Sequence, residues 1–317
     1  ARRGEAIRIF TGAPMPDGPD TVMMQEDCRE QDGQVTLRPG IARGANHRAA
    51  GEDVAAGATV LRSGQRLRPS DLGQAAAVGR GTLQVARPLQ AGVVSTGDEL
   101  CEPGGPLAPG GIYDSNRFTV QGLLAQLGCQ VHDLGILPDD RAAVTDALAD
   151  ASARLDLVVT SGGVSVGEED HVKQAVEALG QLHSWRLAIK PGRPIALGQL
   201  GRVPFVGLPG NPVAVVVTFV TIVRPLVLRM LGGRADPPHL FKVKAGFDHT
   251  KKRERREWVR ARLVAHDGEL RVDKHPSQGA GILSSIVESD GLVELPEEMT
   301  QLKAGTLVDF LPFSEVT

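Results

Sequence analysis

Short apolar runs alternate with helical segments from about residue 89 to 234, and this alternation constrains the fold more than any other feature of the chain. The pattern predicts strands and helices in turn: strands at 91–96, 131–137 and 155–160, and helices at 115–128, 140–153 and 168–180. The region continues with a strand at 186–189, a hairpin with Gly198 and Gly201 in its turn, and a helix after Asn211. Such alternation favours a mostly parallel sheet with helices on both faces, so we expect a central three-layer α/β domain.

The two ends of the chain lack this alternation. Beyond residue 236, stretches such as "EWVRARLV" and "TLVDFLPF" alternate polar and apolar residues without a helical period, which predicts a small β-barrel or sandwich. Residues 1–57 are irregular and rich in Gly, Pro and Asp, with short strands. We therefore predict a multidomain α/β protein with four parts: a β-rich lobe at 1–57, a linking domain at 58–88, the α/β domain at 89–234 and a C-terminal β-barrel at 235–317.

Charge and composition exclude several classes of function. Lys and Arg number 35 against 38 Asp and Glu, a net charge of −3, whereas the surface of a nucleic-acid-binding protein is basic. The three cysteines have neither the spacing of a zinc site nor that of a disulfide framework, which suits a reducing cytoplasm. No signal peptide is apparent, and the most apolar run, 213–223, is shorter than the roughly 20 residues that span a bilayer. We expect a soluble, cytoplasmic protein that binds neither nucleic acid nor membrane.

Polar segments follow the expected strands, and in an open parallel sheet ligands bind outside the carboxyl ends of the strands. The segments are "STGDEL" (95–100), "PDD" (138–140), "TSGGVSVGEED" (160–170) and "GLPGNP" (207–212). Their expected ligand-binding residues are Ser95, Thr96, Gly97, Asp98, Ser161, Gly162, Gly163, Ser165, Pro209, Gly210, Asn211 and Pro212. They also supply the carboxylates of Asp98, Glu99, Asp139, Asp140, Glu168, Glu169 and Asp170. Oxygen ligands of this kind favour Mg²⁺ over zinc.

The stretch "TSGGVSVGEED" has two interpretations. Acidic residues in the first turn of a helix complement its dipole by roughly 0.3–1 kcal/mol each, which accounts for one or two of the three carboxylates. A loop that wraps a phosphate or a pyranopterin, with Asp170 free to hold a cation, accounts for the Ser-Gly-Gly as well. "GLPGNP" is equally open: Asn211 and Pro212 either cap a helix or begin a helix that binds an anion.

Two basic stretches stand out. "AIKPGRP" (188–194) places Lys190 and Arg193 on a turn stiffened by Pro and Gly. Two cations there would attract an oxyanion, which Arg can bind through two hydrogen bonds; a solvated turn is the alternative. The charge run "KKRERRE" (251–257) lies in the expected barrel, and we interpret it as a solvated strand edge, where charges discourage pairing with another strand.

Seven motifs in this order resemble the MoeA family of molybdopterin molybdenumtransferases, which also supplies the E domain of gephyrin. They are "RIFTGAPMPDG" (8–18), "GEDV" (51–54), "STGDEL" (95–100), "IYDSNR" (112–117), "TSGGVSVGEEDHVK" (160–173), "IKPGRP" (189–194) and "GLPGNPVA" (207–214). The resemblance implies a molybdopterin-binding α/β domain followed by the barrel. It also implies a homodimer with its active site at the subunit interface.

The activity that the resemblance implies is insertion of molybdenum from molybdate into the dithiolene of adenylylated molybdopterin. AMP is released and Mg²⁺ assists. Carboxylates around a metal suit hydrolysis of the adenylate, while N–H groups and cations suit molybdate, phosphate and pterin. The pathway partners implied are a molybdopterin adenylyltransferase and the molybdoenzymes.

Individual residues carry the resemblance to the active site. Glu99, Asp139 and Asp170 match the acidic active-site positions, and of these Glu99 and Asp170 are the expected metal ligands. Thr11 and Asp53 match residues of the lobe that, in this family, faces the partner subunit's crevice. The remaining matches are the prolines of the final loop and the basic turn suited to molybdate: Pro209, Pro212, Lys190 and Arg193.

The sequence also departs from the family pattern. The family's upstream Asp-Asn-Ser-Ala-Met-Asp-Gly segment is absent, so we expect a chain shortened at its N-terminus that lacks one catalytic carboxylate. Arg48 stands where two or three basic residues are frequent, and Ala214 replaces a frequent Ser, which would weaken anion binding. Two other functions stay open: a hydrolase with Ser165 in the nucleophile-elbow pattern "GVSVG" (163–167), and a pterin-binding scaffold without catalysis.

Overall fold

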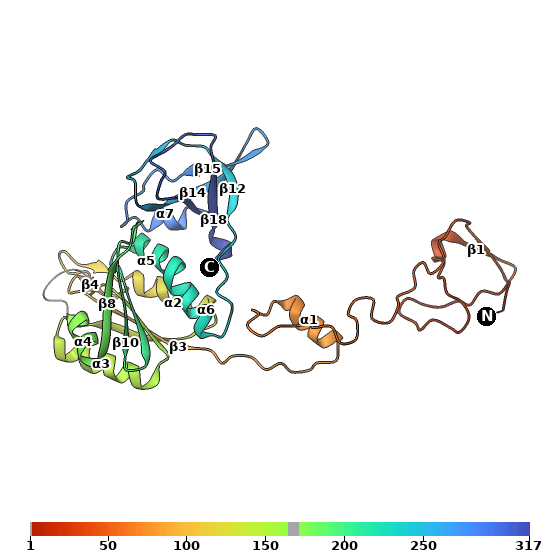
Figure 1. Ribbon diagram of the computed structural model, residues 1–317, viewed down its shortest axis with the longest axis horizontal. Coiled ribbons are helices and arrows are strands. Elements are labelled where there is room, and N and C mark those ends of the chain that lie inside the picture. Colours follow the sequence, from red (N-terminus) through yellow and green to blue (C-terminus); the bar gives the residue numbers. More distant parts are fainter. Residues whose placement is uncertain (1, 164–170) are drawn as a thin grey trace. The chain divides into compact units, whose positions relative to one another are not determined.

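The computed structural model describes residues 2–163 and 171–317, without the side chains of residues 184 and 185. The chain forms two compact units (Figure 1). One comprises Ala1–Arg62 and Leu67–Gly81, and the other comprises Ser63–Arg66 and Thr82–Thr317. The multidomain α/β fold class is confirmed, while the four-part division at residues 57, 88 and 234 stays a prediction.

The first unit is mostly irregular. Its sheet is a hairpin of β1 (Cys28–Gln31) and β2 (Gln34–Leu37), preceded by a 3₁₀ turn, η1 (Gln25–Asp27). The hairpin forms because Asp32 and Gly33, at its turn, both accept a positive φ, as a two-residue type I′ turn requires. The helix α1 (Pro69–Ala77) starts after Arg68, whose backbone N–H donates to the Asp71 carboxylate.

The central sheet of the second unit has six strands in the order β6-β3-β7-β11-β10-β8. Their bounds are β3 (Gln90–Thr96), β6 (Gln130–Leu137), β7 (Leu157–Ser161), β8 (Gly180–Arg186), β10 (Pro194–Leu200) and β11 (Val203–Leu208). The first four in spatial order are parallel, and β10 runs antiparallel to both of its neighbours. The predicted parallel sheet is therefore confirmed, with two added strands at one edge.

One strand differs from the sequence-based expectation. The apolar residues at 186–189 predict a strand there, but β8 (Gly180–Arg186) begins directly after helix α4 (His171–Leu179) and pairs with β10 along its whole length. Gly180 and Gly198 permit this pairing, because a Cβ at either would lie within 2.5 Å of a backbone oxygen on the facing strand. Gly198 consequently lies inside β10, and of the two glycines only Gly201 is in the hairpin turn.

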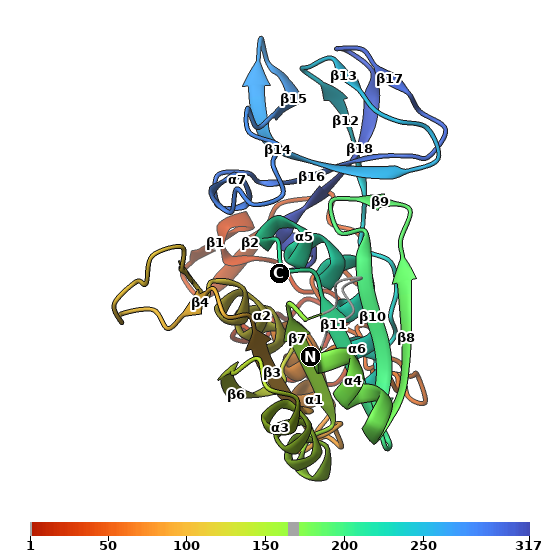
Figure 2. The same ribbon diagram turned by 90° about the vertical axis from the view of Figure 1, so that its left-hand side faces the viewer.

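Helices cover both faces of this sheet, as the alternation predicts. One core cluster joins the sheet to α2 (Asn116–Gln126), α5 (Pro212–Thr218) and α6 (Arg224–Met230). A second cluster joins the other face to α3 (Arg141–Arg154) and α4 (His171–Leu179), which lie side by side in Figure 2. Successive strand residues alternate between the two clusters, with Val93 in the first and Val94 in the second.

The last apolar helix packs into the core. Helices α5 and α6 are joined by a π-helical turn (Phe219–Val223) into one helix, Pro212–Met230. Among the helices that the structure describes, this is the one with the length and apolar composition of a membrane span. Val215, Phe219 and Val227 are nevertheless fully buried against the sheet. The sequence-based interpretation as a core helix is confirmed.

The C-terminal part is a closed barrel. Its five strands, in spatial order, are β15 (Glu269–Lys274), β12 (Phe241–Ala245), β18 (Leu307–Pro312), β16 (Gly291–Leu295) and β14 (Arg256–His266), and β14 pairs back onto β15. The short strand β9 (Ile189–Lys190) comes from the α/β domain and pairs in parallel with β14. The barrel is completed by α7 (Ser284–Val287), by 3₁₀ turn η3 (Phe313–Glu315) and by the pair of β13 (His249–Thr250) and β17 (Gln301–Leu302).

Candidate active site

The carboxyl ends of four parallel strands meet at one edge of the central sheet. Ser161, at the end of β7, is in register with Ser95 of β3 and Leu208 of β11, and Thr96 is in register with Leu137 of β6. The segments that follow these strands therefore leave the same edge, as the sequence predicts. The chain crosses from one face of the sheet to the other around β3, which is the position where open α/β sheets bind ligands.

Four hydroxyls at this edge are buried and have no partner in the described ranges. Ser95 and Thr96 end β3, and Thr160 and Ser161 end β7; each of the four residues is at most 8% exposed. Within the described part of the chain, none of the four side-chain oxygens has a hydrogen-bond partner. Burying a hydroxyl without a hydrogen bond costs about 1–3 kcal/mol. Thr96 and Ser161, the last residues of their strands, lie next to the ligand-binding edge, where a polar ligand would supply the missing hydrogen bonds.

Two glycines after β7 bring the chain directly over β3. Gly162 and Gly163 have positive φ values of 86° and 63°. A Cβ at Gly162 would lie 2.6 Å from the backbone oxygen of Thr96, and one at Gly163 would lie 2.6 Å from the Thr96 hydroxyl. The Ser-Gly-Gly of the sequence is therefore needed for close approach between two strand ends. The next seven residues, including the expected Ser165, Glu168, Glu169 and Asp170, lie outside the described residues.

The described carboxylates have different roles. Asp140 caps α3, since its side chain accepts a hydrogen bond of 2.8 Å from the Ala143 N–H. Asp98, Glu99 and Asp139 are exposed at the strand ends, and Asp139 lies 3.9 Å from the His171 ring nitrogen Nε2. The Glu99 side chain folds back over Gly97, where a Cβ would lie 2.7 Å from Glu99 Oε2. In the described ranges, no three His, Cys, Asp or Glu side chains gather as a metal site would require.

The segment after Glu99 is held by a buried arginine. It forms a small arm in which β4 (Leu100–Cys101) pairs with β5 (Ile112–Tyr113). Arg117 of α2 is 3% exposed and forms ion pairs with Asp114 at 3.1 Å, with Asp133 at 2.5 Å and with Glu102. These pairs join the arm to α2 and β6. The "IYDSNR" motif therefore fixes the loop that carries Glu99.

The basic turn is attached to the barrel. Lys190 lies in β9, opposite Glu257 of β14, and its Nζ donates to Glu257 Oε1 at 2.7 Å. Arg193 is exposed, and its backbone oxygen accepts from the Leu187 N–H. Gly192 has a φ of 101° and would clash with Thr218 if it carried a Cβ. Lys190 is thus ion-paired at the domain junction with its side chain 46% exposed, and its expected role as an oxyanion ligand stays a prediction.

A backbone oxygen of the barrel accepts a hydrogen bond from the first turn of α5. Asn211 is the N-cap residue, as predicted, but its side chain makes no capping hydrogen bond. The Val213 N–H donates instead to the backbone oxygen of Ala280 at 3.0 Å, and Asn116 Nδ2 donates to the Gly210 oxygen at 2.7 Å. The exposed amide of Asn211 is therefore not required for capping.

A cavity of about 980 Å³ lies between the strand ends and the barrel. Its lining contains seven of the predicted ligand-binding residues: Gly162, Gly163, Lys190, Arg193, Pro209, Gly210 and Asn211. The cations among the described lining residues are Lys173, Arg186, Lys190, Arg193 and Arg260, against the single carboxylate of Glu257. Excess positive charge in a concave site attracts an anion.

Sequence reasoning missed the barrel's contribution to this cavity. Arg260 is 2% exposed, and its guanidinium donates to Ser285 Oγ at 3.1 Å and to the Gly279 oxygen at 3.0 Å. Burial lowers the pKa of Arg260 to about 10, so the group keeps its charge at neutral pH. Trp258, on the same strand, also lines the cavity, and its indole N–H is buried without a described partner. The alternation gave no signal, because Arg260 occupies one of its polar positions, on the face opposite the barrel-core residues Val259 and Ala261.

The charge run at 251–257 is solvated only in part. Lys251 is 7% exposed and donates to the backbone oxygens of Pro296 and Met299, both at 2.8 Å. Arg256 pairs with Glu294 and Glu297, and Glu257 is 4% exposed. The interpretation was wrong for these three residues, because β14 is flanked by β15, β16 and β9 and has no free edge at Arg256 and Glu257.

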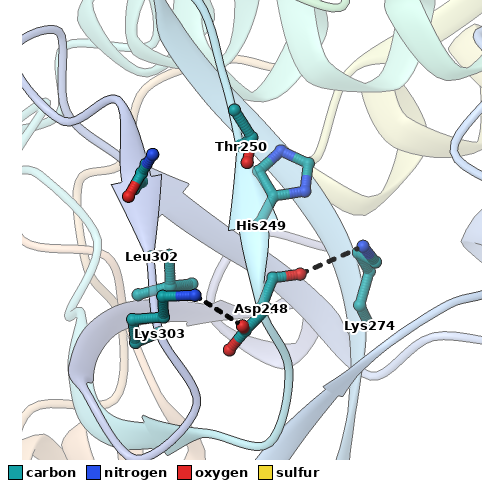
Figure 3. Close-up of a pocket in the computed structure, with 7 residues that line it drawn as sticks. Asp248, His249, Thr250, Lys274, Leu302 and Lys303 are labelled. Atoms are coloured by element: carbon teal, nitrogen blue, oxygen red, sulfur yellow. Dashed lines mark hydrogen bonds and ion pairs between the residues drawn. The ribbon is translucent and has the colours of Figure 1, made fainter.

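A smaller pocket of about 210 Å³ lies in the barrel itself (Figure 3). Asp248 is at its centre, where its carboxylate accepts from Lys303 Nζ at 3.0 Å and its backbone oxygen lies 3.5 Å from Lys274 Nζ. His249, also in this pocket, has its Nε2 3.3 Å from Glu257 Oε1. Glu257 therefore contacts one basic side chain from each side of the domain junction.

The remaining predicted residues are in the first unit or at the rim of the second. Thr11 and Asp53 belong to the first unit and are exposed. Pro209 is buried and Pro212 is half-buried at the start of α5. The parts expected of these residues in catalysis stay predictions.

Three family models match the chain in sequence order. Residues 1–79 match the MoeA N-terminal region (domain I and II), residues 92–229 match a probable molybdopterin binding domain, and residues 242–313 match the MoeA C-terminal region (domain IV). The matches together cover most of the chain, including all the strand-end segments.

Individual proteins agree with the family models. The chain is 42% identical over 315 residues to a molybdopterin molybdenumtransferase of Haemophilus influenzae, covering 98% of this chain and 78% of the relative. It is 37% identical over 309 residues to molybdopterin molybdenumtransferase 2 of Mycobacterium tuberculosis, covering 95% and 75%. The crystal structure of the molybdopterin biosynthesis MoeA protein of Pyrococcus horikoshii OT3 superposes with a TM-score of 0.78 at 30% identity, covering 98% of this chain and 76% of that one.

Proposed function

This chain belongs to the MoeA family of molybdopterin molybdenumtransferases, and we propose that it inserts molybdenum from molybdate into adenylylated molybdopterin with release of AMP. It is a transferase of molybdenum cofactor biosynthesis. The observation that supports the detailed reaction best is the set of four buried hydroxyls at the ends of β3 and β7 that have no partner among the described residues. They lie beside Gly162 and Gly163, which line the cationic cavity.

The proposed substrate fits this arrangement chemically. An adenylylated pterin brings phosphate oxygens and pterin nitrogens, which would satisfy hydroxyls that cost stability while unpaired. Molybdate is an oxyanion, and the cations of the cavity wall suit it: Lys190, Arg193 and Arg260. Arg260 is held in place by Ser285 and Gly279 before any ligand arrives, so little side-chain entropy is lost on binding.

The carboxylates are proposed to act on the adenylate. Glu99 and Asp139 are exposed at the strand ends, where they can contact a bound phosphate or its metal. Mg²⁺ suits carboxylate oxygens, and Glu99 with Asp170 would hold it; the ion would neutralise phosphate charge as AMP leaves. Asp139 lies near His171, so together they can orient a water molecule and accept its proton.

The assembly and location are also part of the proposal. By family resemblance, the enzyme is a cytoplasmic homodimer, and Thr11 and Asp53 of one subunit complete the site of the other. The substrate would come from a molybdopterin adenylyltransferase, and the product would pass to molybdoenzymes.

A single-turnover assay tests the reaction. The protein is mixed with adenylylated molybdopterin, Mg²⁺ and molybdate, and AMP and pterin-bound molybdenum are measured over time. We expect both to appear together and to require molybdate. Pterin binding without AMP release would contradict the proposal and favour the non-catalytic scaffold. Stoichiometric labelling of Ser165 by a fluorophosphonate would favour the hydrolase instead.

A further inference from the structure

A buried carboxylate of the barrel contacts the basic turn of the α/β domain. Glu257 is 4% exposed, and its Oε1 accepts from Lys190 Nζ at 2.7 Å. The two residues also occupy paired positions of β14 and β9, so the backbone holds their side chains close together. Strand pairing and the ion pair with Glu257 together fix the position of Lys190 on the cavity wall.

The barrel buries this carboxylate on its other side, next to His249. His249 Nε2 lies 3.3 Å from the same oxygen, Glu257 Oε1, and the His249 side chain is 12% exposed. Burial lowers the pKa of His249, so at neutral pH its ring is uncharged and Lys190 supplies the counter-charge of Glu257. The second oxygen, Oε2, is buried without a partner among the described residues. Glu257 is therefore buried beside His249, whose Nε2 makes no hydrogen bond within the described residues, and Lys190 of the turn both donates to it and matches its charge.

We propose that Glu257 is a positioning residue that fixes the Lys190 ammonium for binding of the oxyanion substrate. This inference rests on the proposed function. A Lys side chain has a flexible four-carbon stem and three N–H donors. Glu257 takes one donor and restricts the stem, which leaves two donors for an anion in the cavity. The barrel thus takes part in substrate binding through a residue that itself need not touch the substrate.

Two other roles of Glu257 would change the molybdate dependence differently. A carboxylate close to an anion site repels the anion, so a Glu257 that acted mainly through its charge would weaken molybdate binding. Its removal would then lower the molybdate concentration that gives half-maximal rate. A purely structural Glu257 would change stability or the maximal rate and leave the molybdate dependence unchanged.

A double-mutant cycle distinguishes these effects, since it measures whether two residues act through each other. The variants are Glu257→Ala, Lys190→Ala and the double variant, with the molybdate concentration for half-maximal AMP release as the readout. We expect each single variant to raise this concentration by about fivefold to tenfold, a shift typical of coupled neighbours. The double variant should match Lys190→Ala alone, with the maximal rate changed less than about twofold in Glu257→Ala.

Two further variants serve as controls. Glu257→Gln keeps an oxygen that accepts from Lys190, so it should recover part of the loss. Glu297→Ala removes a barrel carboxylate that pairs with Arg256 and not with Lys190, and it should leave the molybdate dependence unchanged. If thermal unfolding shows that Glu257→Ala does not fold, the double-mutant cycle is made with Glu257→Gln and Lys190→Ala instead.

Additive effects in the double variant, or a lower half-saturating molybdate concentration in Glu257→Ala, would overturn the inference. Its failure can be separated from failure of the proposed function. If the unsubstituted protein releases no AMP, the function is wrong, and the same variants are compared by calorimetric binding of molybdate alone. Equal molybdate affinity of all variants in that measurement would overturn the role of Glu257.

Discussion

Gly163 lies so close to Thr96 that a Cβ atom at position 163 would be 2.6 Å from the Thr96 hydroxyl. Gly162 and Gly163 therefore lie directly against the end of β3 with no room for a side chain. The same Cβ would also lie 2.6 Å from Val172 at the start of α4. Gly163 therefore lies between the end of β3 and the start of α4.

Gly163→Ala is expected to destabilise the protein by about 1–3 kcal/mol, because its φ of 63° and the two close contacts both oppose a side chain. Denaturant unfolding measures this change, and AMP release should fall with it. Gly122→Ala is the matched control: it lies in α2, and nothing lies within 4 Å of an added Cβ. That control should gain about 0.5–1 kcal/mol. Equal stability of the two variants would show that the loop can move away.

Ser161→Ala should separate stability from activity. Its hydroxyl has no described partner, so its removal should leave the free energy of unfolding unchanged or raise it by up to about 1 kcal/mol. If the hydroxyl contacts the substrate, kcat/KM for AMP release should fall by about fivefold to tenfold. Ser285→Ala is the contrast, since Ser285 Oγ accepts from Arg260, and its loss should cost about 1–3 kcal/mol. Normal activity of Ser161→Ala would remove this hydroxyl from the site.

The barrel should lose stability in mild acid through His249. Burial lowers the pKa of His249 in the folded state, so the unfolded chain binds a proton first as the pH falls through about 6.5. The free energy of unfolding should therefore decrease below that pH, despite the opposing contribution of Glu257. His249→Gln should show a shallower decrease than the unsubstituted protein in denaturant titrations between about pH 7 and pH 5. Identical pH profiles would contradict this role.

Cys129 should resist alkylation in the folded protein. Burial in the core beside α2 raises the pKa of its thiol to about 11, so roughly one molecule in a thousand carries the reactive thiolate at pH 8. Cys28 and Cys101 are partly exposed and should react with iodoacetamide first. Mass spectrometry of the alkylated peptides measures the order. Modification of Cys129 at the rate of Cys101 would mean that the core opens there.

Much of the fold could be predicted from local pattern alone. The alternation of apolar runs with helical segments indicated the parallel sheet, because burial on both faces requires near-continuous apolar strands such as 157–160. The barrel was indicated by the period-two alternation of "EWVRARLV". Strand β8 was misplaced, since its position depends on pairing with β10 and not on its own residues.

Part of the candidate site could also be predicted from local sequence pattern. The segments after each strand could be assigned to one edge, because parallel strands bring their carboxyl ends together. Arg260, Trp258 and Glu257 could not be found in this way, since they come from the barrel, far along the chain. The side chain of Asn211 was expected to cap α5, but a backbone oxygen of Ala280 takes one of the free N–H groups.

By itself, the sequence determined the periodic elements, the family motifs and the chemical groups at each strand end, because these depend on neighbouring residues. Only the tertiary structure decided which groups lose their water and which find partners. The Lys190 ammonium has a hydrogen-bond partner because a distant strand brings the Glu257 carboxylate to it. The Thr96 hydroxyl has no partner among the described residues, because the segment that lies against it offers only Gly163, which has no side chain.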